Sequence, residues 1–176
     1  MRYVAIALAL LCGNAFAQSK DMSFFVTSAG PGKGADLGGV KGADQHCQAL
    51  AKAAGAGSKT WRAYLSESPS TNARDRIGNG PYYNSMGVML AADKDALHAR
   101  SGDAAVFIDE RGNRINGQWQ GSPSPVQHDI LTGSTATGML MSGNTCADWT
   151  ATTGMSLVGY SDGLGPSMNS APPYNQ

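Results

Sequence analysis

The chain has 176 residues, with 13 Lys and Arg against 13 Asp and Glu, and only 15% of its residues are charged. This length suits one domain, and the balanced charge excludes the broad basic surface of nucleic-acid binders and polybasic membrane proteins. After the first 17 residues no stretch approaches the roughly 20 apolar residues of a transmembrane helix. We therefore expect one loop-rich domain with no nucleic-acid partner and no membrane span.

The N-terminus has the pattern of a secretory signal peptide. Met1–Tyr3 is a short basic start, Val4–Cys12 is apolar, and Ala15–Ala17 places small residues where a signal peptidase reads them. We expect residues 1–17 to be removed and residues 18–176 to form the mature domain. The expected location is secreted, periplasmic or at the cell surface.

Export leaves Cys47 and Cys146 as the structural cysteines of the mature chain. In an oxidising compartment they most simply form one disulfide. Two free thiols, or pairing with other molecules, are the alternatives. No cluster of Cys and His has zinc-site spacing, so a structural metal is not expected.

The first part of the mature chain predicts two strands with a helix between them. Met22–Ser28 is rich in β-branched and aromatic residues and predicts a strand. Gly42–Ala54 repeats small apolar residues at helical spacing and is followed by Gly55, a typical helix end. Apolar residues occupy every second position of Thr60–Ser66, which predicts a strand whose inward-facing residues are Trp61, Ala63 and Leu65.

Shorter elements follow, separated by long loops. Asp93 is suited to cap two helical turns over Asp93–Ala99. The other predictions are two extended pieces around Asn84–Gly87 within Pro81–Ala92, a hairpin of Val106–Asp109 with Arg114–Asn116, and strand-like runs at Asp129–Thr132, Thr145–Thr150 and Ser156–Tyr160. The predicted class is α+β, with one main early helix packed on short antiparallel strands.

Candidate ligand-binding residues lie in the loops of the C-terminal half. An exposed aromatic ring beside amides and carboxylates suits sugar binding, because the ring stacks on the sugar's apolar face and its polar neighbours take the hydroxyls. Trp119 lies in a polar loop and is the expected exposed ring, whereas Trp61 and Trp149 are expected in the core. The candidates are Trp119, His128, Asp129, Asn144, Asp148 and Asp162.

Metal binding and catalysis are weaker interpretations of the same residues. Loop-borne Asp and Asn are oxygen ligands of the kind Ca²⁺ prefers, but the chain has no EF-hand spacing, so we expect no cofactor and keep Ca²⁺ as the alternative. His128-Asp129 is the one pair that could belong to a hydrolase site, and no G-x-S-x-G motif accompanies it. We therefore expect a non-enzymatic protein and assign no catalytic residue, with a small exported hydrolase as the alternative.

Several segments appear in an order typical of one family: Phe24–Ser28, Leu37–Cys47, Trp61–Ser66, Arg76-Ile77 with Pro81–Tyr83, and Thr145–Thr150. The Gly-Gly-x-x-Gly-Ala-Asp-x-x-Cys signature joined to Thr-Cys-x-x-Trp-Thr resembles the secreted bacterial endostatin-like proteins, often called lectins. The resemblance runs from about residue 22 to residue 162. It implies a C-type-lectin-like fold whose long loops bind a glycan, an extracellular matrix protein or another host protein.

The sequence departs from that family at its C-terminus. Members usually continue with a further Cys and a closing Tyr-Cys-Phe strand. The family pattern implies that Cys47 pairs with the closing Cys and Cys146 with the one before it, but this sequence reaches Gln176 without either. The resemblance therefore predicts a domain that lacks its last strand, and an incomplete structural fragment is a further alternative.

Overall fold

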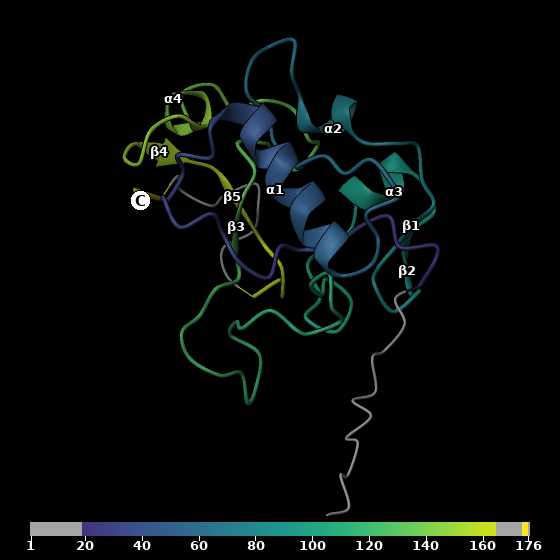
Figure 1. Ribbon diagram of the computed structural model, residues 1–176. Helices are drawn as coiled ribbons and strands as arrows, with labels where there is room; N and C mark the ends of the chain where they lie inside the picture. The colour runs from purple at the N-terminus through teal and green to yellow at the C-terminus, as the bar shows by residue number, and fades with distance from the viewer. Residues whose placement is uncertain (1–18, 165–173, 176) are drawn as a thin grey trace, which may run out of the picture.

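The computed structural model describes residues 19–164 and 174–175 (Figure 1). Three two-stranded antiparallel sheets, β1–β2, β3–β5 and β4–β6, accompany one long helix and several short ones. This confirms the α+β class. In chain order the described elements are α1 (Gly39–Ala53), α2 (Ala73–Arg76), β1 (Tyr82–Tyr83), β2 (Met89–Ala91), α3 (Lys94–His98), β3 (Asp129–Leu131), α4 (Cys146–Trp149), β4 (Met155–Ser156), β5 (Val158–Tyr160) and β6 (Tyr174–Asn175).

Helix α1 begins three residues before the predicted start, at Gly39. Gly38 and Gly39 have φ angles of 73° and 72°, a left-handed backbone that glycine adopts readily and that leads into the helix. At the other end the Gly55 N–H donates to the Lys52 carbonyl, as the predicted glycine stop requires. Small buried residues, Ala43 among them, let α1 lie close to the rest of the core.

The two long strands predicted near α1 do not form ladders. Met22–Ser28 is joined to a neighbouring segment by a single bridge between Val26 and Asp109. In Thr60–Ser66 the predicted inward residues are buried, but side chains of α1 take the backbone donors that a strand would use. The Trp61 N–H donates to Gln48 at 3.0 Å and the Ala63 N–H donates to Asp44 at 2.8 Å. Both segments are extended chain that forms no continuous ladder with a neighbour.

The predictions for residues 81–99 are confirmed. Strands β1 and β2 pair around a turn in which the Asn84 side chain accepts the N–H groups of Met86 and Val88, each at 3.0 Å. Asp93 caps helix α3, since its carboxylate accepts the Ala96 N–H at 2.8 Å. The hairpin predicted farther along is reduced to one bridge between Ile108 and Arg114.

The segment Thr145–Thr150 is a left-handed turn instead of a strand. Its residues Cys146, Ala147, Asp148 and Trp149 have φ angles of 45°, 53°, 55° and 64°. The turn places Trp149 in the core, where its side chain is 0% exposed and its Nε1–H donates to the Ser66 carbonyl at 2.9 Å. Core placement of Trp149, and likewise of Trp61, agrees with the sequence prediction.

Cys47 and Cys146 are free thiols, so the disulfide expected between them is not formed. The Cys146 Sγ faces the Met155 carbonyl at 3.4 Å, and Cys47 packs against the cluster of Met22 and Trp61. Burial raises the pKa of Cys47 to about 11, with Asp44 adding to the effect. Each cysteine therefore contacts other groups of the protein and is not bonded to a second sulfur.

Within residues 19–164 and 174–175, no helix is both long and apolar enough to cross a membrane. The predicted signal peptide, residues 1–17, lies outside the described residues.

Candidate functional site

The structure brings together His128 and Asp162, which are 34 positions apart in the sequence. Strands β3 and β5 run antiparallel, and the Ser161 N–H donates to the His128 carbonyl at 3.1 Å. The His128 Nδ1–H then donates to the Asp162 carboxylate at 2.7 Å. The His128 residue is only 3% exposed, and its ring lies edge-on to Tyr160 at 5.1 Å.

The Asp162 carboxylate accepts three hydrogen bonds. Burial by itself would raise the pKa of this carboxyl, but hydrogen bonds from the Gln118 N–H, the Leu164 N–H and His128 outweigh it and hold the pKa below its ordinary value. The two backbone bonds measure 2.7 Å and 3.0 Å. Asp162 thus fastens the loop around Gln118 to the end of β5.

Asp129 and Trp119 flank this pair. The Asp129 carboxylate is solvent-exposed, and its Oδ1 lies 3.9 Å from the His128 Nε2. Trp119 is half-buried, because its Nε1–H donates to the Ile115 carbonyl at 2.9 Å and the Arg114 guanidinium covers its ring at 5.3 Å. Trp119 is nevertheless more exposed than Trp61 and Trp149, which are both buried.

The remaining candidates, Asn144 and Asp148, lie in another part of the fold, at the turn that contains α4. The Asn144 amide donates to the Ser142 carbonyl, and the Asp148 carboxylate accepts the Thr145 hydroxyl at 3.0 Å. Both therefore stabilise their own turn. Within the part of the chain that the structure describes, no group of three or more His, Cys, Asp or Glu side chains is placed to hold a metal ion.

A cleft of about 910 Å³ lies beside these residues. It is walled by the extended segment 23–31, by residues 60–65 and by residues 129–132, with Ala43 and Cys47 of α1 also in its lining. Its aromatic residues are Phe24, Phe25, Trp61, Tyr64, Tyr82, Phe107 and Tyr160. Polar side chains in the lining include Arg114, Asn116, Gln127 and Asp129.

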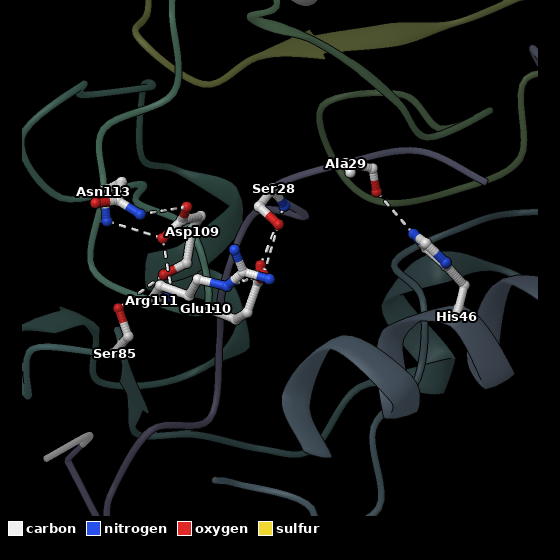
Figure 2. A network of polar contacts seen from close by, with 8 residues as sticks. All are labelled: Ser28, Ala29, His46, Ser85, Asp109, Glu110, Arg111 and Asn113. Carbon is white, nitrogen blue, oxygen red and sulfur yellow. Dashed lines mark hydrogen bonds and ion pairs between the residues drawn. The ribbon is translucent and has the colours of Figure 1, made fainter. Parts of the chain in front are cut away.

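A buried polar network fixes one wall of this cleft (Figure 2). The Glu110 residue is 0% exposed, and its carboxylate accepts the Ser28 N–H at 3.1 Å and the Ser28 hydroxyl at 2.5 Å. On the other side, the His46 Nε2–H of α1 donates to the Ala29 carbonyl at 2.7 Å. Figure 2 shows Ser28 and Ala29 held between Glu110 and the helix.

The turn that carries Glu110 is itself closed by its neighbour Asp109. The Asp109 Oδ1 accepts the N–H groups of Arg111 and Asn113, each at 2.8 Å, and Ser85 donates to the Asp109 carbonyl at 2.8 Å. Sequence reasoning missed Glu110 and the cleft. The available signal was an Asp-Glu pair directly after the apolar run Val106–Ile108, where a strand end places carboxylates against the core.

When the sequence is compared with models of protein families and with curated proteins, it matches no family model and no curated protein.

Proposed function

We propose that this chain is an exported, non-enzymatic binding domain whose ligand occupies the cleft beside Asp129. The supporting observation is the hollow of about 910 Å³. Protein interiors are packed as densely as organic crystals, with few voids larger than a water molecule. Ligand sites, by contrast, measure about 300–1,000 Å³ and combine an apolar lining with a few polar groups. The cleft fits the second description.

The proposed architecture is lectin-like, of the endostatin-like type that the sequence resembles. It is supported by the early helix α1, the short antiparallel strands and the long loops that follow them. The ligand is a glycan or an extracellular protein. Arg114, Asn116, Gln127 and Asp129 provide the polar contacts, and the aromatic lining provides the apolar ones.

Binding to a glycan array, with and without Ca²⁺, and to a panel of extracellular matrix proteins tests this proposal. Ala136 is half-buried and lines the cleft, whereas Ala104 is half-buried and does not. Ala136→Trp should fill the cleft and weaken binding at least about 10-fold, a cost of about 1.4 kcal/mol. Ala104→Trp is the matched control and should leave binding unchanged.

A second pair of variants probes the charge at the cleft. Asp129→Asn removes an exposed carboxylate from the lining, and Asp21→Asn removes an exposed carboxylate elsewhere. Only the first should alter binding. The proposal fails if the folded protein binds nothing on either panel, or if Ala136→Trp leaves the affinity of a bound ligand unchanged.

The second candidate function is a small exported hydrolase, favoured by the hydrogen bond from His128 to Asp162. A buried carboxylate that orients an imidazole through Nδ1 is the arrangement of a general-base histidine. This candidate predicts turnover of ester, peptide or glycoside probes that is lost in His128→Ala while the far-UV circular dichroism stays unchanged. Binding without turnover favours the first proposal.

A further inference from the structure

The segment Phe24–Ser28 has one edge whose N–H groups are hydrogen-bonded and one open edge. On the satisfied edge, the N–H groups of Phe24, Val26 and Ser28 donate to Tyr83, Ile108 and Glu110. In extended chain the backbone groups of successive residues point to opposite sides. Phe25 and Thr27 therefore direct their N–H and C=O groups the other way, and in the described part of the chain these groups have no hydrogen-bond partner.

The segment Trp61–Leu65 has the same asymmetry. The N–H groups of Trp61 and Ala63 donate to side chains of α1. Arg62 and Tyr64, which alternate with them, have backbone N–H and C=O groups without a partner among residues 19–164. This second open edge belongs to residues that line the cleft.

Strand β3 provides a third open edge. Its ladder to β5 is bonded through even-numbered residues, since the Ser161 N–H donates to His128 and the Thr132 N–H donates to Leu157. Asp129 and Leu131 are therefore the non-hydrogen-bonded positions, and their backbone groups point away from β5. No hydrogen bond to those groups is present within the described residues.

Three open edges around one apolar cleft favour a ligand that carries its own row of backbone donors and acceptors. Unpaired backbone groups on a strand edge form a template for another polypeptide, and an extended peptide that joins such an edge gains one row of main-chain hydrogen bonds. We propose that the cleft binds an extended strand from a partner protein, which pairs with the edge of Phe25 and Thr27. This inference rests on the proposed binding function and names its ligand class.

The lining indicates the sequence pattern of that strand. Side chains alternate between the two faces of a strand, and the cleft is aromatic and aliphatic inside with polar groups among its lining residues. The partner segment should alternate apolar and polar residues over about seven positions, within the usual strand length of 3–10 residues. The aromatic contact between Phe25 and Trp61, with centroids 4.9 Å apart, marks where two walls of the cleft meet.

Amide hydrogen exchange with a peptide mixture tests this inference. The probe is a mixture of synthetic seven-residue peptides, with threonine at every second position and Val, Ile, Leu, Phe, Tyr or Trp at the others, at about 1 mM in total. Binding should slow exchange at Phe25 and Thr27 at least about 10-fold, while Val26, already bonded to Ile108, changes little. Unchanged exchange at Phe25 and Thr27 overturns the inference.

Backbone methylation of the best-binding peptide shows which edges it uses. N-methylation at the odd positions removes one row of donors, and N-methylation at the even positions removes the other. Loss of binding with one set means pairing with the Phe25 edge alone, and loss with both sets means insertion between two edges. Either result supports the inference, and retention of binding with both sets overturns it.

The two proposals fail separately. If Ala136→Trp weakens the binding of a glycan while no peptide slows amide exchange at Phe25 and Thr27, the inference of a bound strand is wrong and the proposed binding function stands. If neither glycan, matrix protein nor peptide responds to Ala136→Trp, both fall. Ala104→Trp is the control throughout.

Discussion

Glu110 receives two hydrogen bonds from Ser28, one from the backbone N–H at 3.1 Å and one from the hydroxyl at 2.5 Å. The carboxylate lies inside the protein and also meets the exposed Arg111 guanidinium at 3.5 Å. These contacts join two segments 82 positions apart. They hold the wall of the cleft against the turn at Asp109 (Figure 2).

Glu110→Ala should be strongly destabilising, because it leaves both Ser28 donors without their acceptor. A buried unsatisfied donor costs about 1–3 kcal/mol, so we expect a loss of about 3 kcal/mol in the free energy of unfolding. Glu110→Gln keeps an acceptor oxygen and should lose less. Urea denaturation measures both variants, and equal losses would contradict the role of the Ser28 hydrogen bonds.

Asp162 should make stability depend on pH in the acid range. Its pKa in the folded protein lies below the ordinary value of 3.8, so the folded state favours the ionised carboxylate. Its contribution is fully present above pH 3.8 and is lost as the pH falls through the lower, folded pKa. The difference in unfolding free energy between the native protein and Asp162→Asn should therefore be constant near neutral pH and shrink in acid.

The control for this pH dependence is Asp21→Asn, which removes an exposed carboxylate from the protein surface. A difference between native protein and Asp162→Asn that stays constant down to about pH 2.5 would contradict the lowered pKa.

Ala147→Gly should stabilise the protein. Ala147 is exposed and has a φ of 53°, in the left-handed region that costs a residue with a Cβ about 1–2 kcal/mol. Glycine avoids this cost, partly offset by its greater freedom in the unfolded chain, so we expect a gain of about 0.5–1 kcal/mol. Ala49→Gly, at an exposed position inside α1, is the opposite control and should lose about as much. Thermal unfolding that ranks the two variants the other way would contradict the left-handed turn.

Thiol titration should distinguish Cys47 from an ordinary cysteine. In the chain without residues 1–17, two thiols should react in denaturant, since neither is bridged. In the folded protein Cys47 has a pKa of about 11 against an ordinary 9.0, so it holds about 100-fold less thiolate at pH 8. Its alkylation should be slower by at least that factor. A chain with no reactive thiol in denaturant would show that the disulfide forms.

Elements determined by local chemistry could be predicted from the sequence. The small-residue face of α1, its Gly55 end and the Asp93 cap all act within a few residues, and all are found in the structure. Strand pairing could not be predicted in the same way. The alternation of Trp61, Ala63 and Leu65 correctly predicted which side chains are buried. A β-ladder also needs a neighbouring strand in register, and this pattern does not reveal one.

The candidate site shows the same division. The proximity of His128 to Asp162 depends on the pairing of β3 with β5, which residue spacing alone does not reveal. Thr145–Thr150 was wrongly predicted as strand-like, because burial of the Trp149 ring and its bond to Ser66 outweigh local strand preference. Of the three tryptophans only Trp119 is not buried, but nothing in its own loop indicates that Arg114 lies over its ring.

Residue-resolved amide exchange in the protein without ligand is the most direct test of an open cleft. Val26 should exchange slowly because its N–H is bonded to Ile108. Phe25 and Thr27, on either side of it in the sequence, should exchange at least about 100-fold faster because their N–H groups have no hydrogen-bond partner among the described residues. Equal protection at all three residues would show that this edge is already paired and would contradict a binding site there.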